Sequence, residues 1–245
     1  MTKDGKQFFP EAMNMEKQKN SPSQNSGNSQ SQQKTAQVDK KSENPKVELF
    51  VMSHCPYGTQ MEKAMLPVAK TLGDKIDFDL KFCDYAMHDK KELQEQMRQH
   101  CIKQEQPDEL ISYVDCFLAE QDSQKCMQNT GIDQSAVESC TARVDKEYGI
   151  MEKYNDKSTW KSGRFPVFPV YQEANDKYGI SGSPALVVNE QEVQTSRTPN
   201  ALLKTICSAF ESKPEECDQE LSTSAPSPGF GSSSNSGGSS GGSCG

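Results

Sequence analysis

The chain has few hydrophobic residues and no long apolar run. Only 33% of its 245 residues are hydrophobic, one is Trp and three are His. This hydrophobic fraction is low for a chain that packs along its whole length, so we predict that part of it does not fold. No stretch of about 18 apolar residues is present, which predicts no membrane span. The first residues also lack the apolar core of a signal peptide.

Positive charge and metal-binding patterns are scarce as well. The chain has 27 Lys and Arg against 35 Asp and Glu, a formal net charge of -8. This balance argues against a nucleic-acid partner held by its phosphates. No Cys-x-x-Cys pair occurs, and His88 and His100 do not stand at ligand spacing to a cysteine cluster. We therefore predict no metal and no cofactor, with metal handling by Cys55 and His54 as a weaker alternative.

Polar segments at both ends account for the low hydrophobic fraction. Residues 1–45 are dominated by Gln, Ser, Asn, Lys and Glu, and residues 218–245 end in a Gly/Ser-rich stretch. Neither segment offers enough apolar surface to offset the entropy of ordering it. We predict two disordered arms around one folded domain over residues 46–217.

The first part of that domain has the pattern of a strand, a helix and a second strand. Residues 46–52 are apolar and β-branched, Pro56 suits a first helical turn, and Gly73 ends the helical spacing that follows. Residues 75–82 then alternate polar and apolar side chains, as a strand does. This order predicts a right-handed parallel crossover.

The rest of the domain changes from helices back to strands. Residues 89–160 carry apolar and cysteine positions at helical spacing, which predicts a helical insert. Asp133 is expected to cap its longest helix. Residues 185–188 and 192–193 then fit a hairpin, and Thr198 is expected to cap a final helix.

Two motifs carry a resemblance to a known superfamily. The segment Cys55-Pro56-Tyr57-Gly58 opens a helix directly after a strand, and Ser183-Pro184 precedes the late hairpin. This arrangement resembles the thioredoxin-like superfamily. The cysteine-bearing helices resemble the insertion of the DsbA family of thiol-disulfide oxidoreductases, and the spaced cysteines are similar to those of the gamma-interferon-inducible lysosomal thiol reductases.

The resemblance implies an α/β, thioredoxin-like fold with a cysteine-containing helical insertion between its βαβ and ββα halves. It also implies a cis peptide bond between Ser183 and Pro184, with that backbone facing Cys55 and pairing with an extended substrate. Tyr57, Phe165 and Phe168 are candidates for a hydrophobic peptide groove, although aromatic residues beside prolines also serve as plain packing.

Cys55 is the predicted nucleophile. A thiol at a helix N-terminus faces unpaired N–H groups and the positive end of the helix dipole, which lowers its pKa. The usual second cysteine of this motif resolves the mixed disulfide, but here Gly58 takes that position. Cys55 can then act as a monothiol, released by a small thiol, by a partner protein or by another cysteine of the chain.

Cys83 and His54 are the residues predicted to assist the reaction of Cys55. Cys83 ends the second parallel strand at the same sheet edge as Cys55 and is a candidate resolving cysteine, or else an inert buried thiol. His54 tunes Cys55 if it is protonated, and an uninvolved, exposed histidine is the alternative.

Nine cysteines are heavy usage for a reducing compartment. Four of them lie in the helical insert and allow three pairings, of which we favour Cys116 with Cys126 and Cys101 with Cys140. A further bridge is expected between Cys207 and Cys217. These assignments leave Cys55, Cys83 and Cys244, and Cys244 is interpreted as either a tether or an incidental residue.

The leading hypothesis is a DsbA-like thiol-disulfide oxidoreductase that uses Cys55, His54, Pro56, Tyr57, Gly58, Ser183 and Pro184. Its expected partners are protein or peptide thiols and disulfides, with glutathione as a candidate small thiol. The cysteine usage favours an extracytoplasmic location, in conflict with the missing signal peptide. The alternative is a redox-inactive thioredoxin-like module that binds extended peptides at Ser183 and Pro184.

Overall fold

A mixed four-stranded sheet forms the centre of the protein, in a computed structural model that describes residues 35–231 and 244. The strand order is β2-β1-β3-β4. Strand β1 (Lys46–Val51) pairs in parallel with β2 (Asp77–Phe82) and antiparallel with β3 (Ala185–Val188). Strand β4 (Gln191–Val193) closes the hairpin with β3. The predicted parallel crossover and the late hairpin are both confirmed.

The helices occur where the sequence pattern places them. Asp133 and Thr198 cap α5 and α8 with their side chains, as predicted. Among the described residues, no helix is long and apolar enough to cross a membrane. The helices are α1 (Pro56–Leu72), α2 (Asp89–Glu105), α3 (Leu110–Glu120), α4 (Ser123–Asn129), α5 (Gln134–Tyr148), α6 (Ile150–Asn155), α7 (Gln172–Tyr178) and α8 (Pro199–Cys207).

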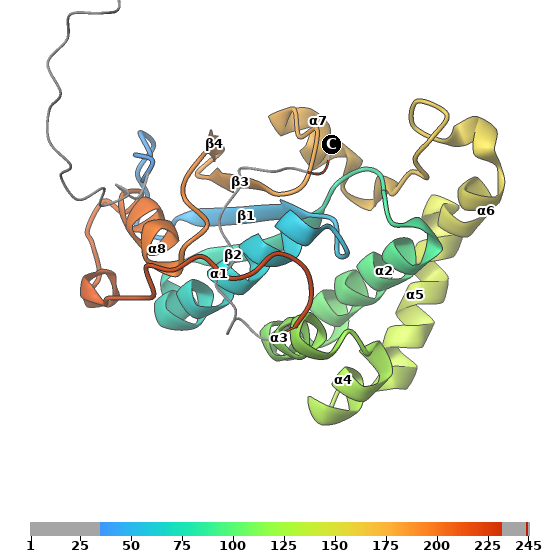
Figure 1. The fold of residues 1–245 in the computed structure, drawn as a ribbon, viewed down its shortest axis with the longest axis horizontal. Coiled ribbons are helices and arrows are strands. Elements are labelled where there is room, and N and C mark those ends of the chain that lie inside the picture. The colour runs from blue at the N-terminus through green and yellow to red at the C-terminus, as the bar shows by residue number, and fades with distance from the viewer. Residues whose placement is uncertain (1–34, 232–243, 245) are drawn as a thin grey trace, which may run out of the picture. The chain divides into compact units, whose positions relative to one another are not determined.

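The two faces of the sheet have different coverings, and β1 shows the alternation most clearly. Leu49 and Val51 point into the main core with apolar residues of α1 and α8. Phe50 lies in a second cluster on the opposite face, where its ring meets Tyr178 of α7 edge-on. Helices α1 and α8 therefore cover one face of the sheet and α7 the other (Figure 1).

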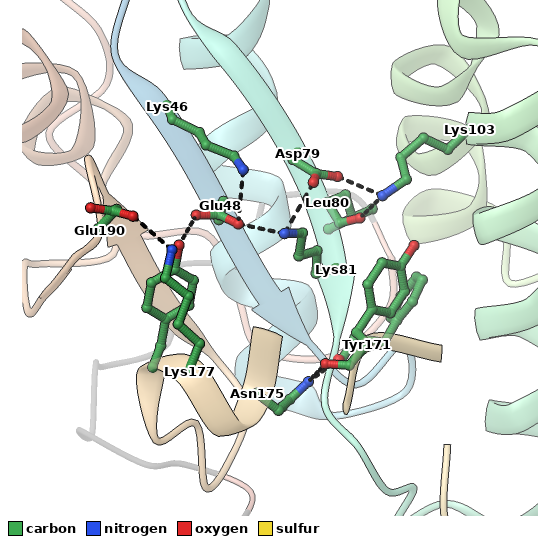
Figure 2. Close-up of polar contacts among 12 residues, drawn as sticks. Lys46, Glu48, Asp79, Leu80, Lys81, Lys103, Tyr171, Asn175, Lys177 and Glu190 are labelled. Carbon is green, nitrogen blue, oxygen red and sulfur yellow. Dashed lines mark hydrogen bonds and ion pairs between the residues drawn. The ribbon is translucent and has the colours of Figure 1, made fainter. Parts of the chain in front are cut away.

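A polar network crosses the α7 face of the sheet (Figure 2). Buried Glu48 on β1 lies between Lys46 and Lys81, and it accepts a hydrogen bond from the Tyr178 hydroxyl at 2.8 Å. Burial alone raises the pKa of Glu48, but hydrogen bonds from Lys81 and Tyr178 and the lysine charges outweigh it and keep the pKa below its usual value. Paired in this way, a charged group can stay buried on a sheet face.

The helical insert lies between the two halves of the fold. Helices α2 to α6 follow β2 and precede α7, β3, β4 and α8. They lie together at one end of the sheet (Figure 1). The expected insertion over residues 89–160 thus occurs between a βαβ half and a ββα half. Its apolar side chains belong to the same core as the sheet, including Met97, Phe117 and Val137.

The predicted N-terminal arm is too long. Residues 1–34 lie outside the described residues, but residues 35–45 pack on the domain. Val38 is buried, and Ser42 exchanges backbone hydrogen bonds with Ala209 and Glu211 beyond α8. The burial of Val38 and these backbone hydrogen bonds order this polar segment.

The predicted C-terminal arm is also too long. The described residues that follow position 218 run along the start of α1, where Gln60 donates to the Pro226 carbonyl at 2.7 Å. Gly229 donates to the Pro56 carbonyl and Gly231 to the Leu118 carbonyl. Residues 219–231 therefore belong to the folded domain. They are held by hydrogen bonds of their backbone groups, which amino-acid composition does not reveal.

Candidate functional site

Cys55 lies at the junction between β1 and α1. Its backbone is extended, and its amide donates to the Met52 carbonyl at 2.9 Å. Pro56 follows as the first helical residue. The Gly58 amide points to the Cys55 sulfur at 3.4 Å, so the side chain caps the helix. This is the predicted placement of a sulfur at the positive end of a helix dipole.

The segment around Ser183 faces this sulfur across the site. The peptide bond between Ser183 and Pro184 is cis, as the resemblance implies. The Ser183 carbonyl oxygen lies 3.6 Å from the Cys55 sulfur, and the Ser183 hydroxyl accepts from the Met52 amide at 2.9 Å. Two segments that are distant in sequence are thus fixed against each other by buried hydrogen bonds.

Gly58 occupies a position that has no space for a side chain. A Cβ atom there would lie 2.6 Å from the Ser183 hydroxyl and 3.0 Å from the Met52 carbonyl oxygen. The Ser183 hydroxyl is held by its hydrogen bond to Met52 and cannot move away at low cost. The packing around position 58 therefore disfavours the second cysteine of the usual motif.

Cys244 was interpreted from the sequence as either a tether or an incidental residue. The structure bonds it to Cys55, 189 residues earlier, with their Cα atoms 6.3 Å apart. Cys244 and Ser183 also exchange two backbone hydrogen bonds of 2.8 Å in an antiparallel bridge. The only sequence signal for this contact was the odd remainder of cysteines after three bridges were assigned.

Cys83 lies in the same buried cluster as Cys55 but is free. Its amide donates to the Val51 carbonyl at 3.0 Å, which places it at the expected edge of the sheet. Burial, followed by the negative charges of Asp84 and Glu92, raises the pKa of the Cys83 thiol. Its role as a resolving cysteine stays a prediction, and its surroundings disfavour the reactive thiolate form.

His54 does not supply positive charge to the site. Burial lowers its pKa to about 4, so the imidazole is neutral at pH 7. The ring lies between Phe117 and Phe230, with centroid distances of 5.7 and 5.4 Å. This lowered pKa disfavours the predicted electrostatic effect of a protonated His54 on Cys55, because burial beside these aromatic rings destabilises the cation.

Glu92 of α2 holds the residue before the nucleophile and was not predicted. Its buried carboxylate accepts from the His54 amide at 2.9 Å and from the Met87 amide at 2.7 Å. Burial raises the pKa of Glu92, but a hydrogen bond from the His88 side chain, the positive charge of His88 and the backbone amides of His88 and His54 bring it below its usual value. The insert thereby fixes the turn that presents Cys55. An acidic residue on a polar helix gave no sign of this.

The three aromatic residues proposed for a peptide groove differ in their surroundings. Tyr57 is half-buried, with the Arg197 guanidinium 5.2 Å from its ring centroid. Phe165 packs beside Tyr85 at the edge of the Cys55 cluster. Phe168 is fully buried against Phe82 in the main core, so its assignment to a groove is wrong.

The remaining cysteines pair away from the site. The structure joins Cys101 to Cys140, Cys116 to Cys126, and Cys207 to Cys217. Two of these bridges lie within the helical insert and the third ties the end of α8 to the segment after it. Within residues 35–231 and 244, no group of three or more His, Cys, Asp or Glu side chains is arranged to hold a metal ion.

Comparison with known proteins agrees with the fold. A family model described as Thioredoxin matches residues 39–207, more than half of the sequence. The chain belongs to this family. No relative was found among the curated proteins. Residues 208–231 and Cys244 lie outside the matched region.

Solved structures of DsbA proteins share the fold. Oxidised DsbA of Mycobacterium tuberculosis is 13% identical, with a TM-score of 0.51 over 71% of this chain and 87% of that chain. The reduced form is 15% identical, with a TM-score of 0.50 over 76% and 92%. The predicted thioredoxin-like fold of DsbA type is confirmed. The similarity to the gamma-interferon-inducible lysosomal thiol reductases stays a prediction.

Proposed function

We propose that this chain is a thiol-disulfide oxidoreductase whose nucleophile is Cys55. One observation carries the proposal: the Cys55 sulfur accepts from the Gly58 amide at the start of α1 and lies 3.6 Å from the Ser183 carbonyl oxygen. The helix start stabilises a thiolate, and the thiolate is the form that attacks disulfides.

The backbone of Ser183 supports protein or peptide substrates. In the structure its amide and carbonyl pair with the backbone of a cysteine that is bonded to Cys55. A substrate cysteine in an extended segment can use the same two hydrogen bonds and bring its sulfur to Cys55. Main-chain recognition of this kind is independent of side chains, so the site suits many sequences. A small thiol such as glutathione can serve as the co-reactant.

An oxidising location fits the cysteine chemistry. Three bridges outside the site lock the helices and the end of α8. Such bridges persist mainly in extracytoplasmic compartments. We therefore place the proposed activity outside the cytosol.

The test is reduction of insulin, and of a glutathione mixed disulfide, by the wild-type chain, by Cys55→Ser and by Cys83→Ser. We expect Cys55→Ser to lower the rate to the uncatalysed background and Cys83→Ser to leave it near wild type. An insulin reduction rate that does not change in Cys55→Ser contradicts the proposal.

A redox-inactive peptide-binding module is the second candidate, favoured by the lack of space for a cysteine at position 58. It predicts a Cys55 pKa near the ordinary value for a free thiol, about 8.5, together with binding of extended peptides. Titration of Cys55 alkylation against pH separates the two candidates, because the oxidoreductase requires a lowered pKa.

A further inference from the structure

We propose that Cys244 is the resolving cysteine of this site, so that Cys55 and Cys244 form one redox couple. The inference rests on the proposed function, because it assigns the partner of the Cys55 nucleophile. In this couple Cys244, 189 positions from Cys55, takes the place of the second cysteine of a Cys-x-x-Cys motif.

The packing around Cys55 requires a resolving thiol from elsewhere. At position 58 a Cβ atom would meet the Ser183 hydroxyl at 2.6 Å. Cys83 is near, but the structure leaves it as a free, fully buried thiol while Cys55 is bonded to Cys244. Of the cysteines around the site, Cys244 is therefore the one that reaches the Cys55 sulfur.

The backbone of Cys244 pairs with the site in the way proposed for a substrate. Its amide donates to the Ser183 carbonyl and its carbonyl accepts from the Ser183 amide, each at 2.8 Å. A substrate segment and Cys244 thus compete for the same two groups. Once Cys244 has bonded to Cys55, it also blocks the released substrate from binding again.

The preceding part of the tail is fixed beside the nucleophile. Gly229 donates to the Pro56 carbonyl at 3.0 Å and to the Thr59 hydroxyl at 3.1 Å. Lys63 donates to the Gly229 carbonyl at 2.6 Å. The ring of Phe230 packs on His54, the neighbour of Cys55. These contacts hold the chain at the start of α1, close to the position where Cys244 reacts.

Anchoring of this kind gives Cys244 a kinetic advantage. A thiol joined to the site by a short connection acts at an effective concentration on the order of millimolar. At micromolar protein it therefore resolves a mixed disulfide roughly 10³-fold faster than a thiol on a second molecule.

The exchange is balanced in atoms and electrons. The Cys55 thiolate attacks a substrate disulfide, forms a mixed disulfide and releases one substrate thiolate. The Cys244 thiolate then attacks the Cys55 sulfur, forms the Cys55–Cys244 bond and releases the second substrate thiolate. The substrate gains two electrons and the chain loses two, and the protons lost by the two cysteines balance those taken up by the substrate thiolates. A small-molecule dithiol or a thiol such as glutathione returns the couple to its reduced form, and the reverse sequence oxidises a substrate dithiol.

The test follows the mixed disulfide directly. The full chain is reduced until Cys55 and Cys244 are open, treated with an equal amount of glutathione disulfide, quenched with acid and mapped by mass spectrometry. In the wild type we expect the Cys55–Cys244 bond and little adduct. In Cys244→Ser we expect a persistent glutathione adduct on Cys55, close to one per chain. Cys83→Ser is the matched control and should behave as the wild type.

The outcomes separate this inference from the proposed function. If Cys55→Ser consumes glutathione disulfide as fast as the wild type, the proposed function fails. If Cys55 reacts but Cys244→Ser forms no persistent adduct, or reacts faster without one, Cys244 is not the resolving cysteine. A persistent adduct in Cys83→Ser assigns resolution to Cys83 and overturns the inference. Equal circular dichroism of all variants establishes that each is folded.

Discussion

Cys55 and the Cys101–Cys140 pair of the helical insert are all buried, but their backbone settings differ. Cys101 and Cys140 join α2 to α5, and both are buried among apolar side chains of the core. Cys55 lies at a helix start and is bonded to Cys244, which holds the Ser183 backbone. The first pair links two packed helices, whereas the second links the proposed nucleophile to a tail segment.

The difference indicates what a disulfide does in each region. Exchange of the Cys101–Cys140 disulfide must release one of the two cysteines as a thiolate. A thiolate is costly in an apolar core, so this disulfide resists exchange. At the helix start the leaving thiolate is stabilised, so the bond exchanges more readily. Under the proposed function, bridges of one chemical type therefore serve stability in the insert and reactivity at the site.

The largest expected effect comes from removing a disulfide of the helical insert. Replacing Cys101 and Cys140 together by Ala opens a loop with a sequence separation of 39. The chain-entropy relation gives a loss of about 4 kcal/mol in the free energy of unfolding. Chemical denaturation measures this loss. Exchange by Cys55, measured at a temperature where the variant is folded, should stay near wild type.

The matched control is the pair Cys116→Ala and Cys126→Ala, which spans a separation of 10. The same relation gives a smaller loss of about 3 kcal/mol. If either insert pair lowered the exchange rate of the folded protein as Cys55→Ser does, the division into stabilising and reactive bridges would be wrong.

An effect of intermediate size is expected at Gly58, which lies at the Cys55 site. Gly58→Ala places a methyl group against the Ser183 hydroxyl and the Met52 carbonyl. We expect a loss of about 1–3 kcal/mol in stability, and slower exchange because the Ser183 backbone shifts. Gly58→Cys meets the same contacts and should not form a bond with Cys55. Denaturation curves and disulfide mapping measure the two results.

The double variant Gly58→Ala with Ser183→Ala isolates the cause. Removing the Ser183 hydroxyl deletes the contact at 2.6 Å but leaves the Met52 carbonyl at 3.0 Å. Part of the lost stability should therefore return relative to the two single changes. Simple additivity of the two changes would show that the Ser183 contact does not limit this position.

Local patterns predicted most of the fold. The apolar, β-branched pattern of β1, the alternation of β2 and the caps at Asp133 and Thr198 depend on residues within a few positions of each other. The position of Cys55 at a helix start followed from the same local rules, together with Pro56. Such features need no knowledge of the tertiary structure.

Features that depend on distant contacts were missed. Composition indicated that the tail is disordered, yet Phe230 packs on His54 and Cys244 pairs with Ser183. The neutral state of His54 also depends on Phe117 and Phe230, which are far away in sequence. Contacts with remote segments order the tail and lower the pKa of His54. Neither effect can be predicted from residues that are neighbours in the sequence.

The smallest expected effect is a pH dependence shared by the two regions, because each contains one half-buried histidine. His54 lies at the site, and His100 of the insert lies 2.7 Å from the Tyr171 hydroxyl. Burial lowers the pKa of each to about 4, from 6.5. Between pH 6.5 and 4 the unfolded chain therefore binds more protons than the folded chain. The stability from these neutral rings is fully present above pH 6.5 and is lost as the pH falls.

Each histidine contributes a slope of at most about 1.4 kcal/mol per pH unit, and less here because both rings are partly exposed to solvent. We expect His54→Leu and His100→Leu each to flatten the rise of the unfolding free energy between pH 4 and 6.5. Carboxylates that titrate in the same range affect all variants alike, so the difference in slope isolates each ring. A slope that stays at the wild-type value in His54→Leu would contradict a lowered pKa of His54 in the folded protein.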